Sequence, residues 1–249
     1  MQHVIAFVAL WVMPTHTGTE ALALILRWFH IIAGITWVGL LYFFNLVNVP
    51  LMKELDAATK GKVLPALMTR ALWWFRWSAV VTVLAGLAYW GQIVATDARN
   101  AGAAPTMALA SFILIWTVTW GILFALLLPG KGLLDNGWVL AILVAIIVAH
   151  SAHWFLHLNT HGWESNRLLS IGIGGGLGWM MLLNVWGVIW RIQKRMIAWT
   201  KANAETGAPI PPESKRMARM AFLASRTNGF LSIPMLFFMA AASHYPMFG

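Results

Sequence analysis

Residues 137–157 read GWVLAILVAIIVAHSAHWFLH, a stretch without Lys, Arg, Asp or Glu. A helix of this length, rising about 1.5 Å per residue, spans the roughly 30 Å hydrocarbon core of a bilayer. Because lipid offers the backbone no hydrogen bonds, a segment that crosses it must satisfy its own amide and carbonyl groups. The stretch therefore predicts a transmembrane α-helix, and similar runs recur along the chain.

The composition agrees with several such helices. The chain has 249 residues, 60% hydrophobic and only 10% charged, with a mean hydropathy of +0.72. A soluble domain carries about 25% charged residues. The pattern predicts an all-α, polytopic transmembrane helix bundle that forms one integral membrane domain over residues 1–249. We expect six spans, at residues 21–49, 71–94, 106–128, 137–157, 169–190 and 230–243, the last starting earlier, near Met220. A short apolar segment at 3–13 is a retained first helix, which would be a seventh span, or an interfacial one.

The basic residues indicate how the spans are oriented. Of the 17 Lys and Arg residues, 14 lie in three connections, at 50–77, 129–136 and 191–229. All three connections fall on one side of the membrane if every run spans it, and cytoplasmic loops are the ones enriched in Lys and Arg. We therefore expect a bacterial inner (cytoplasmic) membrane protein with its C-terminus on the periplasmic side. Residues 191–229 would form a basic amphipathic segment on the cytoplasmic membrane face. The net charge of +9 thus reports topology and not nucleic-acid binding.

Four histidines form the first candidate site. His150, His153 and His157 lie in the span at 137–157, and His161 follows it. Each residue of a helix turns about 100°, so steps of three, four and four residues keep all four on one stripe. Lipid cannot solvate imidazole, so such a stripe is expected to face protein, water, a metal or haem.

Two other histidines match the stripe in depth. His30 in the first predicted span lies at the level of His153 or His150, and His244 after the last span lies at the level of His157 or His161. Imidazoles from facing helices can ligate a haem iron in a bundle core. The sequence therefore predicts one or two b-type haems held by His30, His150, His153, His157 and His244, with the axial pairing left open.

The competing ligand is a copper or zinc ion. His153 and His157, and likewise His157 and His161, are i, i+4 pairs that can chelate such an ion. The stripe holds no carboxylate that could serve a zinc hydrolase as its general base.

Polar and small residues inside the other spans point to helix packing. Asn45, Asn48 and Asn184 favour hydrogen bonds between helices. The glycines crowded into residues 172–178 favour either tight helix packing or close approach to a flat macrocycle.

Two stretches of the chain resemble a known family. They are residues 27–39 (RWFHIIAGITWVG) with 42–45 (YFFN), and residues 226–239 (RTNGFLSIPMLFFM) with 243–246 (SHYP). Both look like parts of the membrane domain of bacterial cytochrome-type urate oxidase, also called urate hydroxylase, and they contain His30 and His244. The His30 stretch is also similar, more weakly, to the short helical membrane protoporphyrinogen oxidases.

The resemblance implies a membrane domain coupled to urate oxidation that passes electrons to a fused c-type cytochrome domain. This chain has no cysteine to attach haem c covalently, so we expect a separate c-type cytochrome, or another subunit of a membrane redox complex, to accept the electrons. If the chain is an enzyme, it is an oxidoreductase of this type. The resemblance supplies no motif for urate contacts, so no catalytic residue is assigned. An electron-transfer or non-catalytic subunit of a larger respiratory complex is the alternative.

Overall fold

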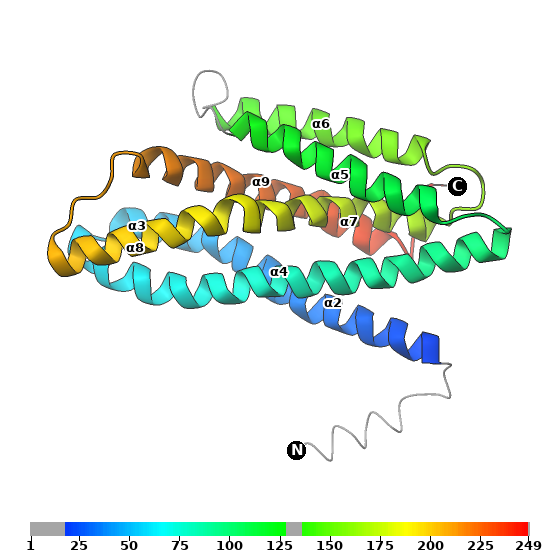
Figure 1. Cartoon of the computed structure of the whole chain (residues 1–249), viewed down its shortest axis with the longest axis horizontal. Coiled ribbons are helices and arrows are strands. Elements are labelled where there is room, and N and C mark those ends of the chain that lie inside the picture. Colours follow the sequence, from blue (N-terminus) through cyan, green and yellow to red (C-terminus); the bar gives the residue numbers. More distant parts are fainter. Residues whose placement is uncertain (1–17, 128–135, 249) are drawn as a thin grey trace, which may run out of the picture.

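The computed structural model describes residues 18–127 and 136–248, and in these residues it is a bundle of long helices without strands (Figure 1). The segment 3–13, predicted as a possible extra helix, lies outside the described residues. The elements are α2 (Gly18–Tyr42), the π-helical turn η1 (Phe43–Asn48), α3 (Val49–Glu54), α4 (Ala57–Ala101), α5 (Thr106–Leu127), α6 (Gly137–His157), α7 (Asn166–Asn184), the π-helical turn η3 (Val185–Ile189), α8 (Trp190–Thr206) and α9 (Ser214–Ala241). The predicted all-α class is confirmed.

Six helical rods correspond to the six predicted spans, because α2, η1 and α3 are continuous and so are α7, η3 and α8. Five of the rods are long and apolar enough to cross a membrane. The sixth, α9, begins at Ser214 and therefore earlier than residue 230, because its basic first half continues as regular helix. The chain is a membrane protein.

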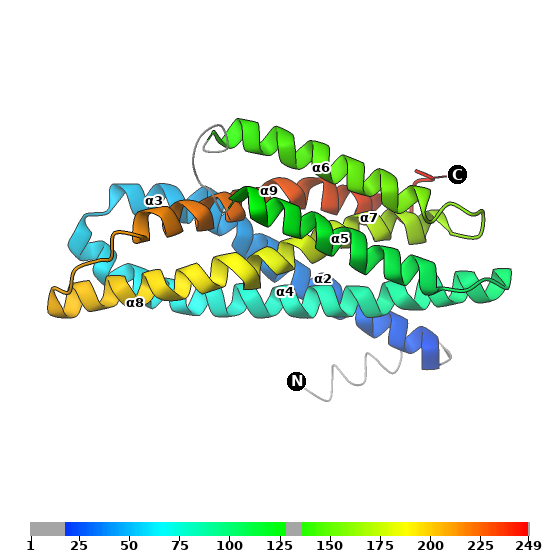
Figure 2. The ribbon, with the colours of Figure 1, turned by 45° about the horizontal axis from the view of Figure 1, so that its top comes forward.

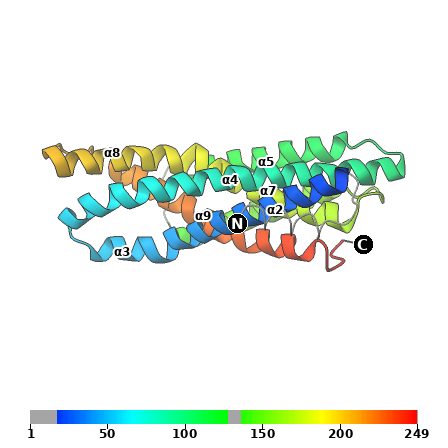
Figure 3. The same ribbon diagram turned by 90° about the horizontal axis from the view of Figure 1, so that it is seen from below.

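Three rods are much longer than a bilayer is thick, namely α2 to α3, α4, and α7 to α8. Helix α4 has 45 residues, or about 68 Å at 1.5 Å per residue, against about 30 Å of hydrocarbon. The excess lies at one end, where α3, α8 and the starts of α4 and α9 project together (Figures 1 and 3). We call this the basic end, because the basic residues 191–229 lie there. Most of these residues belong to α8 and to the first half of α9, so they extend the helical rods. The other end, with the loop between α6 and α7, is the histidine end.

Side-chain caps explain where several helices start. The Asp56 carboxylate accepts hydrogen bonds from the backbone of Ala58 and Thr59, which starts α4, and Asn136 does the same for Trp138 at the start of α6. The Thr59 hydroxyl and these amides stabilise the charged form and hold the pKa of Asp56 below its usual value. At the histidine end, Ser165 caps α7.

Helix α7 is the most buried part of the bundle, with α4, α5 and α9 packed around it and α6 on the outside (Figure 2). Two of its glycines allow this close packing. Gly176 lies directly against the Trp116 indole of α5, and Gly172 against the Phe155 ring of α6. The packing interpretation of the glycine run is therefore right for these two positions.

A buried polar network ties α5, α7 and α9 together at the end of α7. The Trp120 indole donates to the Asn184 side-chain oxygen at 3.0 Å, and the Asn184 amide donates to Asn228 at 2.9 Å. The Asn228 amide in turn donates to the Met181 carbonyl at 3.0 Å. Asn45 donates to Ser225 of α9 at 3.0 Å. The sequence prediction of interhelical hydrogen bonds is thus confirmed for Asn184 and Asn45.

The contact between Gly176 and Trp116 gives a test of the packing. The change Gly176→Ala places a methyl group inside the Trp116 ring, and overpacking of this kind costs about 1–3 kcal/mol. We expect a lower free energy of unfolding in detergent, measured by titration with a denaturing detergent. The matched control is Gly121→Ala, since nothing lies within 4 Å of a methyl group at that position. Equal stabilities of the two variants would contradict the packing.

Candidate functional site

The candidate site is a cavity of about 520 Å³ on the α2 side of the bundle. Residues of α2, α4, α7 and α9 line it, with Phe112 of α5. The volume lies within the range of about 300–1,000 Å³ that is typical of cofactor and small-molecule sites. The cavity extends along α2 from Arg27, which lies one turn before His30, to Tyr42. It therefore lies in the part of the bundle nearer to the histidine end.

Among the described residues that line this cavity, His30 is the only histidine. Its Nδ1 donates a hydrogen bond to the backbone carbonyl of Thr82, on α4, at 2.7 Å. Because a carbonyl only accepts, the proton lies on Nδ1, and Nε2 carries the free lone pair. The structure gives Nε2 no hydrogen-bond partner among the described residues.

Helix α4 is shaped to receive the ring. The Cβ that any residue other than glycine would place at position 86 would lie 2.6 Å from His30 Nδ1 and 2.8 Å from Cε1. Only glycine therefore lets the imidazole lie against α4 at this point. The spacing of Thr82 and Gly86, one helical turn apart, places the carbonyl and the open surface on the same face of α4.

A histidine held in this way is suited to bind a metal centre. Metal-ligating histidines generally donate their second ring nitrogen to a carbonyl or carboxylate, which fixes the tautomer and the ring orientation. A second feature of the cavity also points to a ligand. Trp37, which lines the cavity and is 1% exposed, has an indole N–H without a hydrogen-bond partner in the described part of the chain. A buried donor of this kind costs free energy unless a bound group accepts from it.

Glycines form part of the cavity wall. Gly34, Gly175 and Gly178 line it and contribute no side chain. Among the glycines of α7, Gly172 and Gly176 thus pack against neighbouring helices, while Gly175 and Gly178 lie in the cavity wall. At one end, the exposed Arg27 brings a positive charge to the lining. Ile35 is 70% exposed and also lines the cavity, so this wall opens sideways toward lipid.

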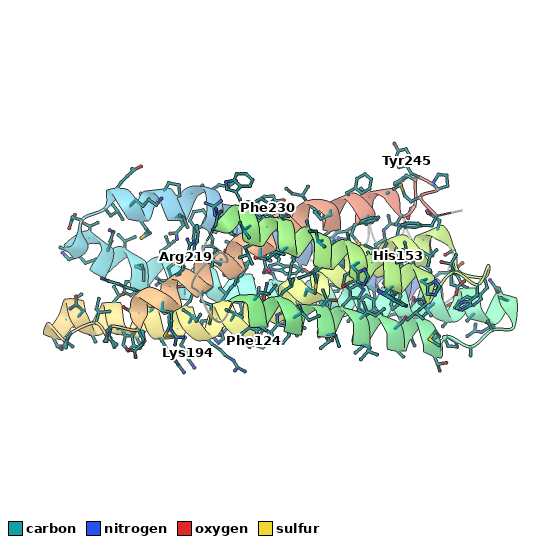
Figure 4. All side chains as sticks on the ribbon, turned by 90° about the horizontal axis from the view of Figure 1, so that it is seen from above. Phe124, His153, Lys194, Arg219, Phe230 and Tyr245 are labelled. Atoms are coloured by element: carbon teal, nitrogen blue, oxygen red, sulfur yellow. The ribbon has the colours of Figure 1, made fainter. Side chains whose placement is uncertain are left out.

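The histidine stripe lies elsewhere. His150, His153 and His157 are exposed on α6 and line neither the cavity nor the buried core. Helices α2 and α6 lie on opposite sides of the bundle (Figures 1 and 2), and Figure 4 shows His153 on the outer surface. The Trp154 indole donates to His150 Nε2 at 2.9 Å. The rings of His153 and His157 are stacked, with centroids 6.4 Å apart.

The remaining histidines are at the histidine end. His161 lies 2.8 Å from the Glu164 carboxylate, and the exposed His244 follows α9, next to Ser243, which lines the cavity. The structure therefore does not bring His30 together with the stripe. Within residues 18–127 and 136–248, no three His, Asp or Glu side chains form a group that could hold a metal ion.

Four residues of the site were missed by reasoning from the sequence: Arg27, Trp37, Thr82 and Gly86. Trp37 could have been found, since it lies seven residues after His30 and so on the same face of α2. Thr82 and Gly86 lie on another helix, and no spacing along the chain links them to His30.

The comparison with known proteins identifies the family. The family model described as "Urate oxidase N-terminal" matches residues 54–249, so it covers α4 to α9 and leaves His30 outside the matched part. No curated protein and no solved structure matches the chain. The match extends over well more than half of the sequence, and it agrees with the resemblance found in residues 226–246. The chain belongs to the urate oxidase N-terminal family.

Proposed function

We propose that this chain is a membrane-embedded redox protein that binds haem b in the α2 cavity and takes part in urate oxidation. The observation that carries the proposal is the geometry of His30, whose Nδ1 is committed to the Thr82 carbonyl while the lone pair of Nε2 is free in a cavity of cofactor size. The family membership supplies the connection to urate.

The residues of the cavity fit haem b. His30 Nε2 would ligate the iron, Thr82 would hold the imidazole in the right tautomer, and Gly86 would give the ring its place against α4. The Trp37 N–H would donate to an acceptor on the bound group, and Arg27 would pair with a carboxylate of the haem. Bound there, haem supplies one-electron transfer. Since the cavity offers His30 as its single histidine, we favour ligation by one histidine of the described chain over the paired ligation expected from the sequence.

The setting of the redox reaction follows from topology. With the basic end in the cytoplasm, as the positive-inside rule requires, the cavity lies toward the periplasmic face of a bacterial inner membrane. Electrons would leave through a c-type cytochrome or another subunit of a membrane redox complex, since residues 1–249 themselves offer no cysteine for covalent haem c.

A second candidate function is that of an electron-transfer or non-catalytic subunit in a larger membrane complex. One observation favours it. The α6 stripe presents imidazoles on the outer surface at the depth of lipid, and hydrocarbon cannot satisfy them. Contact with another membrane protein along α6 would do so. The same stripe is where a copper or zinc ion would bind, with the His153–His157 pair supplying two ligands and a partner the rest.

The haem proposal is tested by removing the proposed ligand. In His30→Ala we expect loss of the Soret band and of haem in a pyridine haemochrome assay of natively purified protein. The control is His153→Ala, which removes a histidine that does not line the cavity and should leave the haem content unchanged. Wild-type protein without haem, or equal loss of haem in the two variants, would contradict the proposal.

The role of Gly86 is tested by adding one methyl group. Gly86→Ala should move the His30 ring from its place, and disturbance of such supporting contacts typically weakens metal-centre binding about 10–100-fold. Alanine has the higher helix propensity, by about 1 kcal/mol, so α4 itself should not be weakened. We expect a shifted Soret maximum and faster haem loss to apomyoglobin. The control is Gly91→Ala on the same helix, where nothing lies within 4 Å of the added methyl group.

The contact along α6 is tested by cross-linking, which the absence of native cysteine makes site-specific. A photoactivatable thiol reagent placed at His153→Cys should give one defined adduct in native membranes. The same reagent at Leu114→Cys, on a 65% exposed position of α5, should give none. Haem staining after denaturing electrophoresis distinguishes a c-type cytochrome from another subunit, because haem c stays covalently attached. Equal labelling at both positions would argue that α6 faces only lipid.

A further inference from the structure

A second cavity lies between the start of α6 and the middle of α9. It has a volume of about 370 Å³, and its lining includes Arg219, Arg226, Leu140, Val144 and Phe230. Figure 4 shows Arg219 and Phe230 on α9 beside the first turns of α6. This cavity is separate from the one that holds His30, and the two share no lining residue.

The cavity is charged on one side and apolar on the other. Arg219 and Arg226 lie on α9 seven residues apart, so they are on one face of that helix. Both guanidinium groups flank the ring of Phe222, with their Cζ atoms 5.7 and 5.2 Å from its centroid. The buried side chains of Leu140, Val144 and Leu223 form the apolar part, and Phe230, 51% exposed, continues it outward.

The position of the cavity along the membrane matches this polarity. Helix α6 has 21 residues, about 32 Å at 1.5 Å per residue, so its ends coincide with the two boundaries of the hydrocarbon core. Gly137 and the 76% exposed Trp138 therefore lie at the headgroup level of the basic end, where tryptophan is favoured. Leu140 and Val144 reach further into the hydrocarbon. The arginines thus belong at the depth of lipid phosphates, with the apolar lining at the depth of acyl chains.

Arg226 is the charged residue of this cavity that an anionic ligand would neutralise. The side chain is only partly exposed, and among the described residues no Asp or Glu carboxylate lies within 4.0 Å of it. Its interaction with the Phe222 ring orients the guanidinium but does not neutralise it. An arginine fork matches the geometry of a phosphate and binds it more strongly than a neutral donor does.

From these observations we propose that the cavity between α6 and α9 is a binding site for one anionic phospholipid of the leaflet at the basic end. Its phosphate lies against Arg226 and Arg219, and one acyl chain lies along Leu140, Val144 and Phe230. A free phosphate ion shares the headgroup chemistry but would leave the apolar half of the cavity unfilled. The site is independent of haem and of urate.

The test uses the full chain in nanodiscs of zwitterionic lipid, titrated with phosphatidylglycerol and followed by native mass spectrometry of the released protein. We expect one retained phosphatidylglycerol, and an apparent dissociation constant raised about tenfold or more in Arg226→Gln, as expected when a charged hydrogen bond is lost. The control is Arg195→Gln, which removes the same charge from an exposed position on α8 outside the cavity. Ala141→Phe keeps both arginines but fills the apolar part of the cavity, and should also weaken retention.

Three results would overturn the site. Equal weakening in Arg226→Gln and Arg195→Gln would mean that lipid adsorbs to the general surface charge. Displacement of the retained lipid by millimolar inorganic phosphate would mean that the headgroup alone is recognised. Complete absence of a retained lipid in the wild-type protein would rule out the site directly. Circular dichroism of each variant establishes that a change in retention does not reflect unfolding.

Discussion

The hydrocarbon of a bilayer offers polar groups no hydrogen-bond partner, and this constraint explains both the helical fold and the position of the candidate site. The backbone meets it by forming helices, and the buried amides meet it by bonding to one another, as Asn184 and Asn228 do at 2.9 Å. His30 meets it with one ring nitrogen only, through the Thr82 carbonyl. Among the described residues that line the α2 cavity, Nε2 of His30 and the Trp37 indole N–H have no hydrogen-bond partner, so these are the groups of the cavity that indicate a ligand.

The fold was largely predictable because the signal is one of length and polarity. The span at 137–157 coincides with α6, and the predicted third span ends one residue beyond α5. The predicted second span, 71–94, falls far short of α4, which runs from Ala57 to Ala101. Hydropathy detects only the part of a helix that contacts lipid, and charged residues such as Lys60 and Lys62 hide the continuation of α4 into water.

The site was less predictable, for a reason visible in α6. Spacing showed that His150, His153 and His157 share one face, but both faces of this helix are apolar elsewhere, so the sequence does not tell which face meets the bundle. In the structure, Leu140, Val144 and Phe155 form the buried face and the histidines lie outside. Matching depth along the membrane normal was necessary for two histidines to meet, but it was not sufficient, because α2 and α6 are on opposite sides of the bundle.

The length of α4 links two regions that lie far apart. The same rod begins beside α3 in the aqueous extension and, further along, carries the Thr82 carbonyl and Gly86 against which His30 is held. Its only internal proline, Pro65, removes one backbone hydrogen bond and is the natural point of bending. The segment from Pro65 to Ala101 contains no further proline, so it is the stiffer part of α4. A bend at Pro65 would therefore move the basic end of α4 and leave the Thr82 carbonyl and Gly86 in place against His30.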